Sequence, residues 1–391
     1  MISHRRTLLL LFAVALGLRV LYTALLSTQP ELTPMSVTSD LNYAREMATG
    51  FTWVTEPYSP RTPGYPALLG TFYLISGKQL WLMVFFQAIL GALTVVLVYS
   101  IGRSFLGAAL ASIAALWFAF HVHHMHIATL FYRDILVVFL LTLLLYLLLR
   151  PFKKMRYAVF AGLVYGALVH VDPQFLLMIP VFVLLVLFKS RHGLLNIQYL
   201  FLFLGVLIVV SAPWTVRNYK VYGQLLPIGL EARKFLRPAK VVLTEPERGI
   251  SDVEDKIIHA SRSRLIQTNA VEFWRFARFH GETPATITAA DTAMWKRPEP
   301  AWSLRHNLVS IVNYGILLPF FFLGLVFAVK DRNRTGLMLA VIVAAYFVMR
   351  SFLGGSERTR IPVDPLIILL AFYGLMALVR RYLPSKAPSE D

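Results

Sequence analysis

Ser39-Asp40-Leu41-Asn42-Tyr43-Ala44 opens the stretch around which this chain is organised, and Arg61-Thr62-Pro63-Gly64-Tyr65-Pro66 closes it. Long apolar segments lie on both sides of this stretch, which predicts a loop held against one face of a membrane. The loop combines an acid, a turn that contains an arginine, and several aromatic rings. Acidic and basic side chains gathered in one loop indicate a candidate active site.

The composition predicts a polytopic membrane protein. Of 391 residues, 57% are hydrophobic and 15% are charged, whereas soluble domains usually carry about 25% charged residues. The mean hydropathy is +0.62. The absence of cysteine excludes disulfides and thiolate metal sites. The net charge of +17 does not indicate nucleic-acid binding, because the lysines and arginines lie mostly between apolar spans.

The apolar spans predict an all-α fold with about ten transmembrane helices, since about 20 apolar residues cross ~30 Å of hydrocarbon. The spans cover residues 8–26, 80–101, 107–122, 134–150, 157–171, 174–188, 199–213, 308–329, 336–350 and 363–380. The 107–122 segment is the weakest of them. The first span follows a basic start like that of a signal peptide. Its apolar run is longer than the roughly 7–15 residues usual there, so we expect a retained anchor.

Basic residues on alternate connections set the predicted orientation. With Arg5 and Arg6 in the cytoplasm, the basic runs at 150–156, 330–334 and 380–386 fall on the same side. Both termini are then cytoplasmic. We expect three parts: a transmembrane module in 1–230 with the outer loop 27–79, an extracytoplasmic loop with a partly amphipathic helix in 231–307, and the last transmembrane helices with a cytoplasmic tail in 308–391.

The two outer loops are expected to contain short helices. In the first loop one helix runs from Leu41 to Thr49, and a second begins at Pro66 and ends near Gly77. In the second loop a capping box at Ser251–Glu254 begins an amphipathic helix that reaches about Phe279. This last helix is expected to lie on the outer membrane face.

Several guanidinium and carboxylate groups share the outer side. They are Asp40, Arg61, Arg133, Asp134, Arg217, Arg358 and Arg360. The planar fork of arginine fits a phosphate, and a carboxylate can serve as a general base on a hydroxyl. Together they describe displacement at a carbon that bears a phosphate leaving group, held at the membrane surface by a lipid.

Each of these residues also has a structural explanation. Asp40 makes a good N-cap for the helix that follows it, and Arg133-Asp134 makes an interfacial ion pair worth little energy. In the same structural explanation, Arg61 is a solvated turn residue, and Arg358 and Arg360 only bind lipid headgroups.

Two further features are ambiguous. Arg19, inside the first span, either snorkels to the outer interface or points into an outward-facing cavity. The histidines at positions 121, 123, 124 and 126 suggest a metal, but no spaced carboxylate or i, i+4 pair accompanies them.

In their order and common sidedness these motifs resemble the GT-C glycosyltransferases, integral-membrane enzymes that include protein O-mannosyltransferases and lipid A aminoarabinose transferases. The resemblance covers most of 1–230 and again 345–375. It rests on the first-loop acid and turn and on later motifs along the chain. These are Gln87 with Gly91, Gly102-Arg103 with Gly107, Asp134, the segment from Pro213 to Gly223, and Arg358 to Pro365.

The resemblance implies an inverting transfer of a sugar from a polyprenyl-phosphate donor to a lipid, glycan or protein acceptor. The implied roles are catalytic acids at Asp40 and Asp134, donor-phosphate contacts at Arg61, Arg133, Arg358 and Arg360, and substrate contacts at Tyr43, Tyr65 and Arg217. No cofactor is expected. A divalent metal stays open, although the first loop lacks an Asp-x-Asp pair. The compact size and the form of the segment from Pro213 to Gly223 favour a bacterial inner membrane, and an archaeal membrane or the endoplasmic reticulum would give the same sidedness.

The main alternative is a transporter or flippase of a lipid-linked or small anionic substrate. Transporters usually place ionisable residues near the midplane on broken helices and show a repeated half. Here no repeat is visible and the charges collect in the outer loops. A lipid-binding membrane protein without chemistry is a second rival to the enzyme, and a polymerase or ligase with the same fold is a third.

Overall fold

A computed structural model describes residues 4–27, 44–45, 48, 62–77, 81–150, 154–188, 193–223, 262–274, 308–309, 311–354 and 357–382. Every regular element within these ranges is helical. The helices are α1 (His4–Ser27), α3 (Gly64–Ile75), α4 (Trp81–Leu106), α5 (Ala108–Ala119), α6 (Val122–Ile127), α7 (Asp134–Leu148), α8 (Arg156–Val171), η2 (Pro173–Met178), α9 (Ile179–Phe188), α10 (Gly193–Tyr222), α13 (Arg262–Trp274), η3 (Ile311–Gly315), α16 (Leu317–Lys330), α17 (Arg334–Leu353), α18 (Glu357–Arg360), η4 (Ile361–Val363) and α19 (Asp364–Tyr382).

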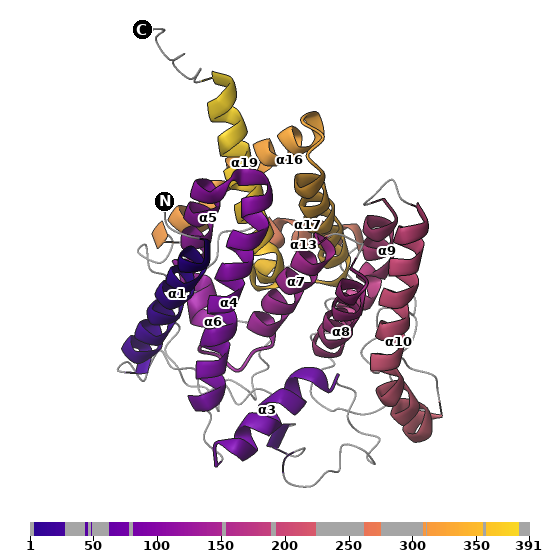
Figure 1. Cartoon of the computed structure of the whole chain (residues 1–391). Coiled ribbons are helices and arrows are strands. Elements are labelled where there is room, and N and C mark those ends of the chain that lie inside the picture. Colours follow the sequence, from indigo (N-terminus) through magenta and orange to yellow (C-terminus); the bar gives the residue numbers. More distant parts are fainter. Residues whose placement is uncertain are drawn as a thin grey trace, which may run out of the picture.

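The helices form one bundle with two distinct ends (Figure 1). Helix α1 packs on α4, α4 on α5 and α7, α7 on α8, α8 on α10, and α16 on α19. The short helix α3 lies at the lower end in Figure 1, whereas α19 finishes at the upper end. We call the lower end, where the chain passes through α3, α6 and η2, the α3 end.

The predicted all-α membrane fold is confirmed. Among the described residues, six continuous helical segments are long and apolar enough to cross a membrane: α1, α4, α10, η3–α16 (311–330), α17 and η4–α19 (361–382). The other predicted spans coincide with the shorter apolar helices α5, α7, α8 and η2–α9. Because α5 has only 12 residues and is about 18 Å long, it does not cross the hydrocarbon core by itself. The count of ten therefore stays a prediction.

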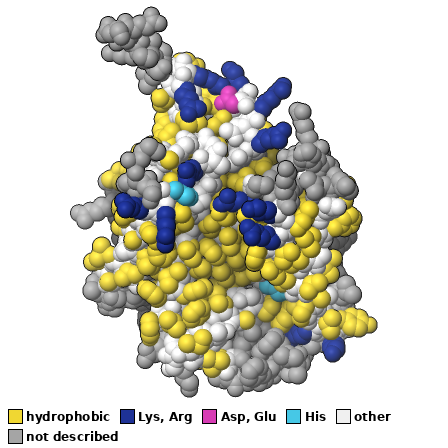
Figure 2. Space-filling view, in the orientation of Figure 1, with side chains coloured by type: hydrophobic (Ala, Val, Ile, Leu, Met, Phe, Trp, Pro, Cys, Tyr) yellow, Lys and Arg dark blue, Asp and Glu magenta, His cyan; other side chains and the backbone are white. Residues whose placement is uncertain are grey.

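Charge is distributed unevenly between the two ends. Figure 2 shows most of the visible lysine and arginine side chains gathered over the upper part of the molecule, above a broad apolar surface. Exposed basic residues next to helix ends on that side include Arg103, Lys154, Arg156, Lys330, Arg332, Arg334, Arg380 and Arg381. Asp331 lies among them and accepts from Arg381 Nη2 at 2.5 Å and from Tyr373 Oη at 2.9 Å. This asymmetry is the pattern that the positive-inside rule describes.

The loop helices differ in detail from the expectation. Helix α3 begins at Gly64, two residues before the predicted start, and Pro66 occupies its first turn, where its missing N–H costs nothing. Helix α13 lies within the predicted amphipathic segment, and its last two residues pack on α17. The Phe273 and Trp274 rings both contact the Phe347 ring. The predicted capping box at 251–254 lies outside the described residues.

Candidate functional site

The predicted site residues fall into two groups. Asp40, Tyr43 and Arg61 lie outside the described residues, as do most of the predicted helix from 41 to 49 and the side chain of Arg358. The described members are Arg133, Asp134, Tyr65, Arg217 and Arg360.

The turn that closes the first loop docks on the C-terminal end of α8. Thr62 is buried, and a Cβ at Gly64 would lie 2.7 Å from the backbone carbon and oxygen of His170. A Cβ at Gly70 would likewise lie 2.9 Å from the Ala44 carbonyl oxygen. Helix α3 therefore reaches this position only because glycine occupies both points of contact.

A buried amide connects this turn to the next loop. Gln87 of α4 accepts from Tyr65 Oη at 3.3 Å through Oε1. Its Nε2 donates to the carbonyl oxygens of Ala128 at 3.0 Å and Leu130 at 2.8 Å. Tyr65 and Gln87 are both fully buried. This arrangement joins the 62–66 turn to the segment that leads into Arg133.

Arg133 and a second arginine converge on the turn between α8 and η2. Arg133 Nη2 lies 3.8 Å from Asp172 Oδ1, and Nη1 donates to the Val171 carbonyl oxygen at 3.4 Å. Asp172 Oδ1 also accepts from the Gln174 backbone N–H at 3.2 Å, and Arg350 Nη1 donates to Gln174 Oε1. Asp172 thus pairs with Arg133, and this pair was not predicted from the sequence.

Asp134 is the first residue of α7, and the predicted span 134–150 begins at the same residue. A carboxylate at this position is favoured by the positive end of the helix dipole. Asp134 and Asp172 together give the α3 end two acids beside Arg133 and Arg350. Sequence reasoning did not select Asp172 or Arg350. The signal for Asp172 was its place before a proline at a helix end, where it caps η2.

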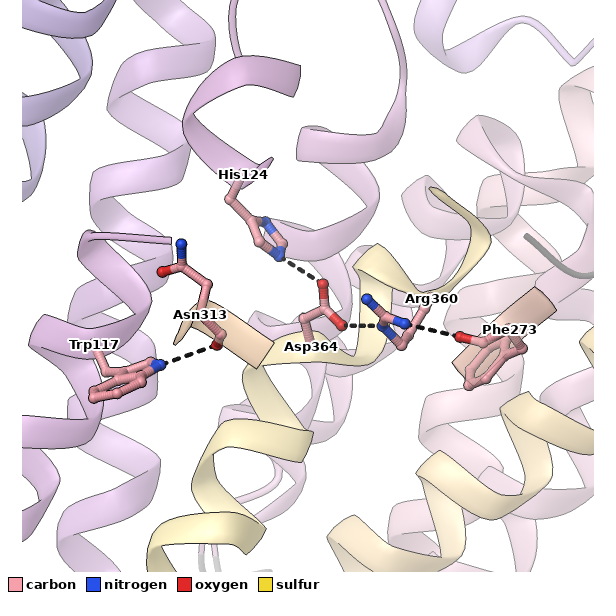
Figure 3. Close-up of polar contacts among 6 residues, drawn as sticks. All are labelled: Trp117, His124, Phe273, Asn313, Arg360 and Asp364. Carbon is pink, nitrogen blue, oxygen red and sulfur yellow. Dashed lines mark hydrogen bonds and ion pairs between the residues drawn. The ribbon is translucent and has the colours of Figure 1, made fainter. Parts of the chain in front are cut away.

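Arg360 lies in a second cluster, built from distant parts of the chain (Figure 3). Arg360 Nε donates to Asp364 Oδ1 at 3.0 Å, and Nη1 donates to the Phe273 carbonyl oxygen at 2.9 Å. The guanidinium lies 3.6 Å from the centre of the Tyr314 ring. Asp364 Oδ2 is 3.2 Å from His124 Nε2. An ionised carboxylate only accepts hydrogen bonds, so the proton lies on Nε2.

The histidines pack within the protein. His124 bonds to Asp364, and His126 Nδ1 lies 3.2 Å from the hydroxyl of Tyr22. Burial lowers the pKa of His121 to about 3 and also lowers the pKa of His124, so both rings are neutral at neutral pH. Across the described ranges, no group of three His, Asp or Glu side chains is arranged to hold a metal. Whether this chain takes a divalent metal stays open.

Arg217 has two contacts within its own helix. Its Nη1 donates to Asn218 Oδ1 at 3.2 Å, and its guanidinium lies 4.9 Å from the Trp214 ring centre. Helix α10 packs against α8 and α9.

The part of the chain that carries Gln87, Asp134 and Asp172 matches a known protein family. A family model for dolichyl-phosphate-mannose-protein mannosyltransferase matches residues 60–215, which is less than half of the chain. The match begins at the Arg61 turn and includes Gln87, Asp134 and Asp172. A search of curated protein sequences found no match.

Solved structures resemble the whole chain in fold. The apo oligosaccharyltransferase of Archaeoglobus fulgidus matches with a TM-score of 0.60 at 14% identity, covering 97% of this chain and 51% of that one. ArnT from Cupriavidus metallidurans bound to undecaprenyl phosphate matches with a TM-score of 0.60 at 16% identity, covering 95% and 60%. The chain has the GT-C fold. It spans about half to three fifths of the length of these GT-C structures.

Proposed function

We propose that this GT-C chain is an inverting glycosyltransferase that moves a sugar from a polyprenyl-phosphate donor to a lipid, glycan or protein acceptor. The observation that carries the proposal is the convergence at the α3 end of arginines and acids on the turn that closes the first loop. Gly64 contacts the backbone at 170–171, and Arg133 contacts Val171 and Asp172. Arg61 directly precedes the docked turn.

Structures with the same fold support the class of donor. ArnT was solved with undecaprenyl phosphate, and the A. fulgidus enzyme with an inhibitory peptide and a dolichol-phosphate. Another structure of the A. fulgidus enzyme holds zinc and sulfate, so a divalent metal stays open for this chain. The sugar, whether hexose or pentose, and the acceptor are to be found by experiment.

The proposed reaction assigns each group one task. Asp40 accepts the proton of an acceptor hydroxyl, whose oxygen attacks the anomeric carbon from the face opposite the phosphate. The bond from that carbon to the phosphate oxygen breaks, and the phosphate leaves on its lipid with an added negative charge. Arg61 and Arg133 stabilise this charge, with Arg358 and Arg360 as further phosphate contacts. Asp134 is the second acid, and Tyr43, Tyr65 and Arg217 contact the substrates.

The proposed location is a bacterial inner membrane, with the α3 end outward and both termini in the cytoplasm. The basic side chains at the opposite end support this orientation. A lipid-linked donor then presents its sugar at the outer interface, where the first loop lies.

The experiment that tests this function is mass spectrometry of the lipids that copurify with the wild type and with Asp40→Asn. Transfer stops in Asp40→Asn if Asp40 is the base, so we expect a polyprenyl-phosphate sugar to accumulate on it. Asp331→Asn is the matched control, because Asp331 lies at the opposite end of the bundle and pairs with Arg381. Asp331→Asn is expected to copurify the same lipids as the wild type.

Other outcomes contradict the proposal. If only bulk phospholipid copurified with the wild type and both variants, the proposal of a polyprenyl-phosphate sugar donor would be unsupported. A single unmodified lipid or solute bound equally by all three would favour a transporter instead. Once the donor is known, full transfer activity in Asp40→Asn would show that Asp40 is not the base.

A further inference from the structure

The turn between α8 and η2 holds the carboxylate of Asp172 in a fixed place. Pro173 follows Asp172 and favours an extended backbone there, and the observed φ of −136° and ψ of 102° suit a helix N-cap. Oδ1 of Asp172 accepts from the Gln174 backbone N–H at 3.2 Å and so caps η2. The Asp172 side chain is only 10% exposed. Its position is therefore set by the local backbone and not by Arg133.

Two helices brace this turn from behind. Tyr165 of α8 donates its hydroxyl to the Phe175 carbonyl oxygen at 2.5 Å. The Tyr346 ring of α17 stacks on the Phe175 ring, with the ring centres 5.7 Å apart. One turn further along α17, Arg350 Nη1 donates to Gln174 Oε1. Helices α8 and α17 together thus hold η2 in place.

Arg133 is held more loosely than the acid beside it. Its side chain is 33% exposed, and its Nη2 lies 3.8 Å from Asp172 Oδ1. Its Nη1 donates to the Val171 carbonyl oxygen at 3.4 Å. Charge-assisted N–H···O bonds are usually about 2.7–2.9 Å long, so both contacts are weak ones. Both are made to the same turn, and that turn therefore directs the guanidinium.

Folding stability does not account for this ion pair. Pairs that involve a side chain as exposed as Arg133 contribute little to stability. A carboxylate in a fixed place can instead restrict the many rotamers of an arginine. A cation stabilises the charge that develops on a leaving group most effectively when it is already in place before the reaction. Orientation of Arg133 is thus the better explanation of the pair.

We propose that Asp172 is a positioning residue for Arg133, and that Gln174 and Arg350 hold the turn that carries Asp172. The inference rests on the proposed function, because Arg133 stabilises the charge of the lipid-linked phosphate only in that reaction. It adds the residues that place this cation. Asp172 acts through Arg133 and takes no part in making or breaking bonds.

The sign of a change in binding separates positioning from simple charge attraction. The probe is undecaprenyl phosphate, and its dissociation constant is measured by native mass spectrometry on the purified 391-residue chain in a neutral detergent. Asp172→Asn keeps a side-chain oxygen that can cap η2, since asparagine and aspartate are equally good N-caps, but it removes the negative charge. If the carboxylate only competed with phosphate for Arg133, this variant would bind the probe more tightly.

We expect Asp172→Asn to bind the probe about two- to tenfold more weakly, because binding must then immobilise a mobile arginine side chain. Arg133→Gln is expected to weaken binding by about tenfold or more, since it removes a charged hydrogen-bond donor. Adding Asp172→Asn to Arg133→Gln is expected to cause no further weakening, because the effect passes through Arg133.

Asp331→Asn is the matched control. It also removes the carboxylate of an aspartate–arginine pair, but this pair, with Arg381, lies at the opposite end of the bundle. We expect it to keep the wild-type affinity for the probe.

Thermal unfolding shows whether the cap survives. Asp172→Asn is expected to unfold close to the wild-type midpoint, and Asp172→Ala, which also loses the cap, at a lower temperature. Gln174→Leu keeps the backbone N–H that Asp172 accepts but removes the oxygen to which Arg350 donates. It is expected to weaken probe binding in the same direction, and it serves as the test variant if Asp172→Asn does not fold.

Two results would overturn the positioning role and leave the proposed function standing. One is unchanged or tighter binding in Asp172→Asn, or in Gln174→Leu where that is the variant that folds, while Arg133→Gln binds weakly. The other is an equal loss from Asp172→Asn with and without the Arg133 side chain. Wild-type affinity in Arg133→Gln, or no binding by the wild type, would instead contradict the phosphate role of Arg133, and the positioning role would fall with it.

Discussion

Gln87 uses every hydrogen-bonding group of its side chain to hold two loops together. Its oxygen accepts from Tyr65, and its nitrogen donates to the carbonyl oxygens of Ala128 and Leu130. Removing the amide leaves two buried carbonyls without a donor, and each such loss costs about 1–3 kcal/mol. Gln87 therefore positions both the 62–66 turn and the segment before Arg133.

We expect Gln87→Leu to lower the free energy of unfolding and to speed hydrogen exchange in residues 62–77. Thr94→Val is the matched control, because Thr94 is buried on the same helix and its hydroxyl bonds only to the Leu90 carbonyl oxygen one turn away. Thermal unfolding and hydrogen-exchange mass spectrometry in one detergent measure both effects. If the two variants lost equal stability and exchanged alike, Gln87 would have no positioning role.

The buried histidines predict a dependence of stability on pH. Burial lowers the pKa of His121 in the folded protein to about 3, and it also lowers the pKa of His124. In the unfolded chain a histidine has a pKa of about 6.5. As pH falls below about 6.5, the unfolded chain binds protons that the folded chain does not, so folding stability falls toward acid pH. Each histidine contributes up to about 1.4 kcal/mol per pH unit.

Thermal unfolding between pH 7.5 and pH 5 measures this slope. His121→Phe removes one titrating group and is expected to make the loss of stability with acid shallower. Identical pH profiles for the wild type and His121→Phe would show that His121 is not buried and neutral in the folded state.

At the scale of elements, close helix contacts depend on glycine. Helix α3 meets the end of α8 at Gly64, and α16 meets α19 where Gly324 and Gly374 each lie against the backbone of the other helix. Small residues allow transmembrane helices to approach closely, and close approach is what holds such helices together in a membrane.

Gly64→Ala is expected to destabilise the α3 contact by about 1–3 kcal/mol, because the added methyl group would meet the His170 backbone. Gly205→Ala on α10 is the control, since Gly205 has open space around it and alanine favours a helix by up to about 1 kcal/mol. The difference in thermal unfolding midpoint between the two variants checks this. Equal midpoints would mean that α3 does not rest on α8.

At the scale of the whole molecule, the two ends carry different chemistry. The α3 end holds the partly exposed Arg133 and the buried Arg360 and Gln87, and the opposite end holds exposed basic side chains. The proposed orientation can be tested cleanly because the chain has no cysteine.

Thr71→Cys on α3 and Lys154→Cys before α8 place single exposed thiols at opposite ends. In intact cells we expect a membrane-impermeant maleimide to label Thr71→Cys and to label Lys154→Cys only after permeabilisation. The reverse pattern would invert the topology and place the proposed active site in the cytoplasm.

The sequence by itself determined the class of fold and the positions of the helices. Each predicted span coincides with a helix, because a long apolar run must satisfy its backbone hydrogen bonds internally when it lies in lipid. The start of α7 at Asp134 and a second helix in the first loop were predictable for the same local reasons.

Only the tertiary structure decided which polar groups meet. Asp364 bonds to His124, 240 positions away in the chain, and Arg133 pairs with Asp172, which lies at the end of a different helix. Arg19 was ambiguous in sequence and is directed inward by Gly91. Local pattern reports whether a residue lies in apolar surroundings. The partner of a buried charge depends on which helices pack together, and that packing is set by contacts between residues far apart in sequence.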